Sequence, residues 1–331
     1  MRYKTLAAAA VFGTMLLSCG REEVQDIHSL TGDPILFSTD IATRSPLFSS
    51  MRGRSFGVMG YGYDGLWSVN EVQATPDVFH KQKVSCSALG VSSYTPVQYW
   101  RNATSYTFFG YYPEESSGVV AASAATYEGV PYIDFTLPSS TDPDDYYDVM
   151  VAKSVENLTN SSKSNVSLTF RHMLFCMNLE ARNLNDEPVR IRRVQFRIDR
   201  LDYTRCRFYM DGRTDAPQGP SVANRRFSIS GTADEVQISP LDNINSEATD
   251  ISGDRNLMLI PQNTMSGEIF VERYNEENGQ WEEKSRAFTS DKEFAPGRRY
   301  TAMMNFTGDK LSVTIIESGE WDDSSVGYQF E

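Results

Sequence analysis

The sequence predicts an all-β protein built from two stacked β-sandwich domains. Helical periodicity is almost absent, whereas short alternating or apolar runs recur between clusters of Gly, Pro, Asn, Asp and Ser, as in sandwiches and barrels. Hydrophobic residues make up 40% of the 331 residues and aromatic residues 12%, which is enough to build cores. The candidate strands are too many for one open sheet, so we expect them to pack in layers.

The N-terminal sandwich is expected to cover residues 34–158. Its candidate strands are Ile35–Ile41, Ser55–Tyr61, Val78–Cys86, Ser105–Tyr112, Tyr132–Leu137 and Tyr147–Ser154. The polar stretch VENLTNSSKSN at residues 155–165 lies between strongly apolar segments and predicts the domain boundary. The C-terminal sandwich is expected to cover residues 159–331. Its candidate strands are Val166–Arg182, Val189–Asp199, Arg205–Met210, Arg225–Ile229, Asn256–Pro261, Glu268–Tyr274, Trp281–Phe288, Arg299–Phe306 and Leu311–Ile316.

The N-terminus predicts a lipoprotein signal peptide over residues 1–18. A basic MRYK segment precedes an apolar run that is too short for a permanent membrane anchor, and LLSC ends in a cysteine. A bacterial lipobox needs that thiol to receive the diacylglycerol, so we expect Cys19 to be the lipidated first residue of the mature chain. Residues 19–33 would tether the body to its lipid. The following GREE resembles the tag that directs lipoproteins to the cell surface.

The charge balance argues against a nucleic-acid partner. The chain carries 44 acidic and 31 basic residues, a net charge of -13, and loss of residues 1–18 would remove two basic residues and make it -15. Such a field repels phosphate backbones and anionic headgroups. Membrane attachment is therefore expected through the lipid alone.

Motifs with catalytic or metal-binding content are missing from the sequence, so we predict a protein that is not an enzyme and holds no cofactor or metal. The three histidines are His28, His80 and His172, and no HExxH, GxSxG or Cys-His spacing surrounds them. GxGxxG at residues 60–65 is followed by LWSVNEV, which shows no helix start, so turn glycines explain it better than a nucleotide site. The aspartates of STDPDDYYDVM lack calcium-loop spacing and predict a solvated turn.

Two further residue groups have structural explanations. Cys86, Cys176 and Cys206 are an odd set without CxxC spacing, so a disulfide framework is not indicated, although one pair could form. The arginines between residues 190 and 207 alternate with Val194, Phe196 and Ile198, which predicts an outward cationic face above a buried one.

The stretch LTFRHMLFCMNLEAR, residues 168–182, changes the face that its apolar residues occupy. Leu168 and Phe170 hold even positions, whereas Met173 and Phe175 hold odd ones. Side chains alternate strictly along an undisturbed strand, so the switch predicts a bulge or bend. We expect His172 to sit at this irregularity and to satisfy freed backbone groups there.

Several motifs occur in order along the chain. YYDVMVAK at 146–153 and LTFRHML at 168–174 are preceded by ILFS at 35–38, ATR at 42–44, FGVMGY at 56–61, YW at 99–100 and YTFFGYYP at 106–113. In this order, and with the lipobox, they resemble the fimbrillin-like (Mfa-like) lipoproteins of Bacteroidales-type bacteria, including the pattern D-L-M-x-A … F-x-H-x-L. The resemblance covers essentially the whole mature chain and makes Phe170 and His172 part of a structural signature.

The resemblance implies two transthyretin-like sandwiches in a pilus subunit of the accessory or tip type that serves cell-surface adhesion. Ile35, Phe37 and Ile41 would plug a hydrophobic groove until a protease cuts after Arg44; Arg52 and Arg54 offer competing sites. A terminal strand of another fimbrial subunit, from Leu311–Ile316 or from the tail Trp321–Phe330, would then fill the groove by β-augmentation. The implied partners are other subunits, the outer membrane through the lipid, and a surface receptor.

A surface glycan-binding lipoprotein is the alternative function. Such a protein would use exposed aromatic side chains as sugar platforms, and Trp67, Trp100, Trp281 and Tyr112 are the candidates. Trp100 and Trp281 lie within predicted strands, which favours a place in the core over a place on a platform.

Overall fold

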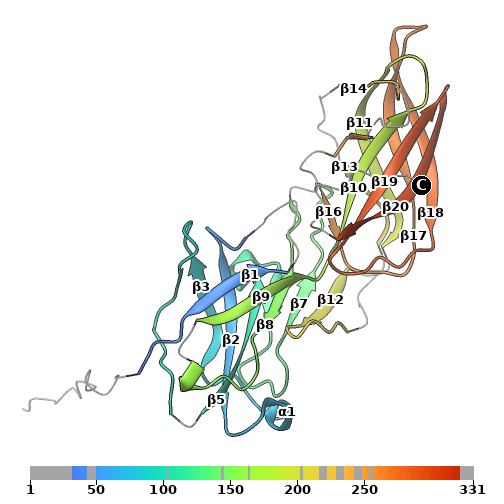
Figure 1. The fold of residues 1–331 in the computed structure, drawn as a ribbon. Coiled ribbons are helices and arrows are strands. Elements are labelled where there is room, and N and C mark those ends of the chain that lie inside the picture. Colours follow the sequence, from blue (N-terminus) through green and yellow to red (C-terminus); the bar gives the residue numbers. More distant parts are fainter. Residues whose placement is uncertain are drawn as a thin grey trace, which may run out of the picture.

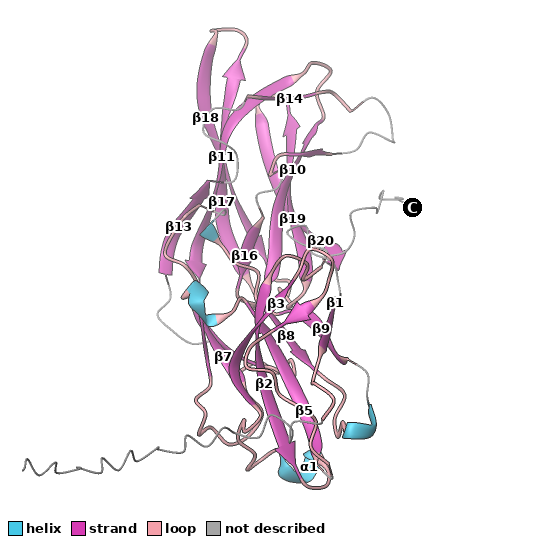
Figure 2. Cartoon of the chain, turned by 90° about the vertical axis from the view of Figure 1, so that its left-hand side faces the viewer, coloured by secondary structure: helices cyan, strands magenta, loops and turns pink. Residues whose placement is uncertain are grey.

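The computed structural model describes residues 32–42, 50–102, 104–142, 145–162, 165–201, 204–215, 222–228, 235–241, 248–252 and 256–320. The predicted all-β fold class is confirmed: strands dominate the described residues, and helices are limited to single short turns (Figures 1 and 2). The strands form two sandwiches that lie one beyond the other in Figure 1. No helix among the described residues is long and apolar enough to cross a membrane.

The first sandwich contains a sheet that, among the described residues, has seven strands in the order β1-β9-β8-β5-β2-β3-β4. Their bounds are β1 Phe37–Ile41, β2 Ser55–Tyr63, β3 Phe79–Cys86, β4 Ser92–Ser93, β5 Ser105–Tyr112, β8 Met150–Lys153 and β9 Val166–His172. The sheet curls so that its two edges come together. Phe37 of β1 contacts Phe79 of β3, and it also contacts Tyr94, which lies just beyond β4.

Both faces of this sheet are buried. Phe56, Val58 and Phe108 point into the curl with Leu168 and Phe170. The opposite face carries a second set of buried side chains, which share one cluster with the three-stranded sheet β12-β7-β6: Met59, Tyr61, Phe109, Tyr111, Ile133, Phe135 and Phe208. This small sheet consists of β6 Val120–Ala122, β7 Tyr132–Thr136 and β12 Arg205–Tyr209. Burial on both faces explains why β2 and β5 are near-continuous apolar runs.

Gly57 shows how closely the central strands approach. It pairs with Tyr111 of β5, and a Cβ atom at Gly57 would lie 2.0 Å from Cζ of the Tyr111 ring. The ring therefore lies across the glycine, which gives a packing reason for a glycine inside a strand.

The second sandwich packs two further sheets face to face. The described strands of one sheet run in the order β15-β10-β19-β20, with β16 also on β10, and those of the other run β13-β11-β17-β18, with β14 on β11. Within the first of these sheets, Phe175 and Tyr300 are in edge contact at 5.6 Å, and within the second, Phe196 stacks on Phe288 at 5.0 Å. The buried side chains of both sheets belong to one cluster. The bounds are β10 Phe175–Asn183, β11 Val189–Leu201, β13 Val222–Ser228, β14 Val236–Ile238, β15 Thr249–Asp250, β16 Leu257–Leu259, β17 Met265–Asn275, β18 Gln280–Ser290, β19 Arg298–Thr307 and β20 Lys310–Glu320.

The chain passes between the sandwiches at Met173 and Leu174. The predicted strand Val166–Arg182 is two strands, with β9 in the first sandwich and β10 in the second, so the switch in apolar parity marks this crossing. The expected domain boundary at residues 158 and 159 falls between β8 and β9, which are neighbours in one sheet. The polar stretch at 155–165 therefore belongs to a connection within the first sandwich.

Sequence reasoning missed several short elements. β4, β6, β14 and β15 have only two or three residues each. The expectation that no helix begins after GxGxxG was wrong, because α1 Trp67–Asn70 follows Gly65, which has φ +83°. This helix is one turn long, and its N-cap residue is Leu66, without a side-chain cap bond.

The β1 strand and its groove as the candidate functional site

β1 forms an edge of the seven-stranded sheet and runs parallel to β9. Phe37 is paired with Val166, Thr39 with Leu168, and Ile41 with Phe170. The Val166 amide donates to the Leu36 carbonyl oxygen at 2.7 Å, and the Ala42 amide donates to that of Phe170 at 2.8 Å. The ladder therefore continues to the last described residue before the segment that contains Arg44.

The residues just before β1 pair with the opposite edge of the sheet. Pro34 forms an antiparallel bridge with Tyr99, the Ile35 amide donates to the Gln98 carbonyl oxygen at 2.9 Å, and the Trp100 amide donates to that of Asp33 at 3.1 Å. The segment 33–42 thus lies between β9 on one side and residues 98–100 on the other. It closes the gap between the two edges of the curled sheet.

The side chains of this segment alternate between core and solvent. Ile35, Phe37 and Ile41 are buried, with exposed fractions of 0%, 3% and 6%, whereas Leu36 is 43% exposed. The Phe37 ring packs edge-on against Phe79 and Phe108, each at 5.7 Å between centroids. Complete burial of an aliphatic or phenyl side chain contributes about 1.5–3 kcal/mol. These three side chains therefore hold the strand by packing.

Tyr94 contacts the same segment through its ring and its hydroxyl group. Its hydroxyl donates to the Ile35 carbonyl oxygen at 2.6 Å and accepts from the Gln98 amide at 3.3 Å. Burial raises the pKa of Tyr94 above its ordinary value, so the hydroxyl keeps its proton at neutral pH. We call the space held by residues 33–42 the β1 groove; its walls are β9 and residues 94–100, and its floor is Phe79 and Phe108.

Comparison with known proteins identifies the family. A family model described as fimbrillin-like matches residues 54–321. The chain belongs to the fimbrillin-like family. A fimbrial protein from Bacteroides vulgatus has a similar structure, with a TM-score of 0.67 at 16% identity over 86% of this chain and 99% of its own.

Two further solved structures share the fold. A candidate cell adhesion protein from Bacteroides ovatus has a TM-score of 0.52 at 14% identity, covering 88% of this chain and 98% of its own. Another from Bacteroides uniformis has a TM-score of 0.51 at 15% identity, covering 87% and 99%. No match is found among curated proteins.

The predicted processing and lipid sites of this fimbrillin-like protein lie outside the described residues. This is the case for Cys19 and Arg44. Of the competing arginines, Arg52 is exposed, whereas Arg54 is half-buried and its guanidinium lies 3.4 Å from the Tyr112 hydroxyl. Of these two, Arg52 is therefore the one more open to a protease.

The two signature residues of the fimbrillin-like protein lie on β9 and point inward. Phe170 is fully buried and meets the Phe56 ring at 5.3 Å. His172 is the last residue of β9, and its Nδ1 lies 2.9 and 2.8 Å from the two carboxylate oxygens of Asp148. We expected His172 to satisfy freed backbone groups, whereas the partner of its Nδ1 is this buried carboxylate.

Asp148 was placed wrongly by the sequence analysis. It was assigned to a solvated turn, yet it is only 1% exposed and faces His172. Among the described residues, no group of three or more His, Cys, Asp or Glu side chains could hold a metal ion. The His172–Asp148 pair joins the end of β9 to the residues just before β8.

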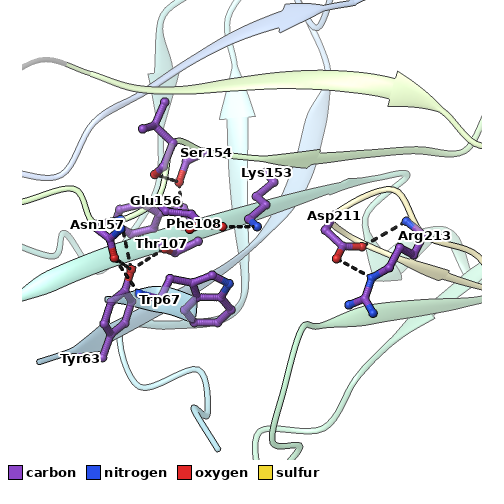
Figure 3. Close-up of polar contacts among 11 residues, drawn as sticks. Tyr63, Trp67, Thr107, Phe108, Lys153, Ser154, Glu156, Asn157, Asp211 and Arg213 are labelled. Atoms are coloured by element: carbon purple, nitrogen blue, oxygen red, sulfur yellow. Dashed lines mark hydrogen bonds and ion pairs between the residues drawn. The ribbon is translucent and has the colours of Figure 1, made fainter. Parts of the chain in front are cut away.

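Of the four aromatic residues considered as sugar platforms, two are buried and two, Trp281 and Tyr112, are half-buried. Trp67 is fully buried, and its backbone amide donates to Asn157 Oδ1 at 2.7 Å in the network of Figure 3, where Tyr63 and Thr107 also meet. Trp100 is 4% exposed. Trp281 remains half-buried, with the Arg192 guanidinium 4.3 Å above its ring.

The arginine-rich strand β11 matches its predicted two-faced pattern. Val194, Phe196 and Ile198 are buried. Four arginines of β11 pair with acids: Arg190, Arg192, Arg193 and Arg197. Arg192 lies 2.6 Å from Glu272, and Arg197 lies 2.8 Å from Glu268. These pairs neutralise the face, which removes the argument for a phosphate-binding surface.

The three cysteines expected to be idle are buried and unpaired in this fimbrillin-like protein: Cys86, Cys176 and Cys206. Burial raises the pKa of the Cys176 and Cys206 thiols to about 12. Both are therefore protonated at neutral pH and poorly reactive.

Proposed function

We propose that this protein is a non-enzymatic fimbrial subunit of the accessory or tip type, assembled by protease-triggered strand exchange. The observation that carries the proposal is the position of β1. It is an edge strand, it buries Phe37 and Ile41 in a groove together with Ile35 just before it, and it is joined to the rest of the sheet through residues 43–49, which contain Arg44.

Cleavage after Arg44 would leave β1 bound only by noncovalent contacts. Its release would expose the unpaired edge of β9 together with the rings of Phe79 and Phe108. An extended segment from another subunit could then take its place, because backbone hydrogen bonds supply affinity and alternate side chains supply selectivity. Until cleavage, the covalent connection keeps the effective concentration of β1 high.

The donor strand in this scheme is the C-terminal tail. Leu311–Ile316, the other candidate, lies inside β20 and is paired with β19 over its whole length. Donation of that segment would break those pairs. The tail Trp321–Phe330 lies beyond β20 and ends in alternating apolar residues, VGYQF. We therefore favour the tail over β20.

The same proposal places the subunit on the cell surface. Cys19 would carry the lipid after removal of residues 1–18, and residues 19–33 would span from the outer membrane to the first sandwich. Gly32 comes thirteen positions after Cys19, a reach of about 45 Å when fully extended. Assembled with other subunits, the protein would serve adhesion to a host or bacterial receptor.

Limited trypsin digestion of the purified acylated protein tests this function. The expected result is a clip after Arg44, a body that stays folded, and ladders of SDS-resistant oligomers on incubation. Arg44→Ala should abolish both the clip and the ladder, whereas Arg52→Ala, as the matched control, should change neither. Cleavage confined to other loops, or a clipped protein that stays monomeric, would contradict the proposal.

A further inference from the structure

Tyr94 touches both the backbone just before β1, at Ile35, and a side chain of β1, that of Phe37. Its ring lies 5.8 Å from that of Phe37 and 5.2 Å from that of Phe79, both edge-on. Its hydroxyl lies 2.6 Å from the carbonyl oxygen of Ile35, two residues before Phe37. One residue of the groove wall therefore contacts two positions of the strand that have a fixed spacing.

The backbone ladder alone cannot fix the register of a strand in this groove. The amides and carbonyls of β9 repeat along the strand, so a shift by two residues offers the same ladder and keeps the same side chains inward. For β1, such a shift would bring Thr39 to the place of Phe37. The Phe37 site, lined by the rings of Tyr94, Phe79 and Phe108, rejects that change through lost packing. The Tyr94 hydroxyl then holds the carbonyl two residues before the ring.

We propose that Tyr94 anchors the strand that occupies the β1 groove: its ring lines the site that sets the register, and its hydroxyl holds the backbone carbonyl two residues before the ring in that site. The groove then accepts a partner strand that runs as β1 does and carries an aliphatic residue followed two positions later by a large aromatic one. The carbonyl of the aliphatic residue accepts the Tyr94 hydroxyl proton, and the aromatic ring packs against Tyr94, Phe79 and Phe108. This inference rests on the proposed strand exchange and names the chemistry of the strand exchanged.

The hydroxyl is difficult to replace with water. Tyr94 packs against the buried cluster that contains Ile35, Phe37 and Phe79, and its hydroxyl oxygen also accepts the Gln98 amide proton. Without the hydroxyl, the Ile35 carbonyl and the Gln98 amide both lose a partner. Because a buried group left unsatisfied is costly, Tyr94→Phe should weaken strand binding while leaving the ring contacts in place.

A nicked form of the full chain allows a direct test. A site-specific protease sequence placed within residues 43–49 cuts the connection after folding and leaves β1 in its groove. Release of the labelled N-terminal fragment is followed on addition of an excess of the peptide GDPILFSTDIA, residues 32–42. Tyr94→Phe is expected to speed release about three- to tenfold, and Tyr147→Phe, an exposed tyrosine, should leave it unchanged.

Equilibrium competition between peptides for the groove measures the preferred register. A peptide with one glycine inserted between Ile35 and Leu36 moves the aromatic ring by one position, and it should compete at least tenfold more weakly than the native peptide against the wild-type groove. Against Tyr94→Phe, this preference should stay the same, because a carbonyl lies two residues before the aromatic ring in both peptides. Against Tyr94→Leu, which removes the aromatic ring, the preference should shrink. An ester in place of the Ile35–Leu36 amide weakens the same carbonyl acceptor, so Tyr94→Phe should cost less with the ester peptide than with the amide peptide.

The possible outcomes distinguish the proposal of strand exchange from the proposal about Tyr94. If the nicked wild-type protein never exchanges its fragment for the native peptide, strand exchange itself is wrong. If it exchanges but Tyr94→Phe does not speed release, or Tyr94→Leu does not reduce the preference between peptides, strand exchange stands and the role of Tyr94 is overturned. A loss of affinity in Tyr94→Phe that is the same for the amide and the ester peptide would also overturn it.

Discussion

Nδ1 of His172 lies 2.9 Å from Oδ1 of Asp148, and both side chains are fully shielded from solvent. The pair occupies the point where the chain leaves the first sandwich, since His172 ends β9 and β10 begins three residues later at Phe175. A buried polar pair stabilises a structure only while both partners are present. The pair therefore fixes the end of β9 against the segment before β8.

Removal of one partner of this pair should destabilise the protein. Asp148→Asn is expected to lower the free energy of unfolding by about 2–4 kcal/mol, because it leaves a buried imidazole with a weaker acceptor. Asp145→Asn, in the exposed turn nearby, is the control and should change it by less than about 0.5 kcal/mol. Urea unfolding measures both. Equal effects of the two variants would show that the His172 contact is not stabilising.

Substitutions at two neighbouring positions, Phe37 and Leu36, test how strongly side-chain packing holds β1 in its groove. Phe37→Ala should cost about 3–4 kcal/mol, because the Phe37 ring is buried among other rings. Leu36→Ala, one residue earlier and half-exposed, should cost less than about 1 kcal/mol. Thermal unfolding of the uncut protein gives the difference. Similar losses for both would mean that β1 is held by its backbone ladder alone.

The buried thiols should resist modification in the folded protein. Burial raises the pKa of Cys176 and Cys206 to about 12, so the reactive thiolate is scarce at pH 8. A Cys19→Ser variant should show almost no reaction with an aromatic disulfide reagent until guanidinium is added, and then three thiols should react. Rapid labelling without denaturant would place at least one of them near the surface.

Glu282 in the β17–β18 hairpin provides a pH-dependent signal. Hydrogen bonds from Asn278, Lys284 and Asn275 lower its pKa to about 2. A lowered pKa in the folded state stabilises the hairpin above about pH 4.5, and this contribution is lost as the pH falls towards 2. Carbon NMR titration should place the Glu282 midpoint near 2, and Asn278→Ala should raise it. A wild-type midpoint above 4 would contradict the hydrogen-bonded geometry.

Strand positions could be read from the sequence where local alternation matches burial. In β9, Val166, Leu168 and Phe170 are buried while Ser167 and Thr169 are exposed, as the pattern predicts. The parity switch in residues 168–182 correctly indicated an irregularity, although its cause is a passage between two sandwiches. The pattern carries no information on which sheet a strand joins, so the expected boundary at 158 and 159 divided one sheet.

The parts that could not be predicted depend on residues distant in sequence. In the sequence, Asp148 is one of several aspartates in a predicted turn. In the structure it is buried against His172, which comes 24 residues later. Tyr94 lies in a loop segment, SSYTPVQYW, and acquires its role from the Ile35 carbonyl, 59 residues earlier. A two-residue strand such as β4 is defined by its pairing with a neighbouring strand. Two residues are too few to show an alternation of apolar and polar side chains, so the sequence does not reveal it.

The course of β12 has a mechanical consequence. After β11 the chain returns from the second sandwich, and β12 pairs with β7 of the first before the chain goes back to β13. A pull on the second sandwich is thus carried by the β12–β7 ladder from Arg205 to Tyr209 as well as by the connection at Met173 and Leu174. In the fibre that we propose, tension on a subunit would be shared by the hydrogen bonds of this ladder.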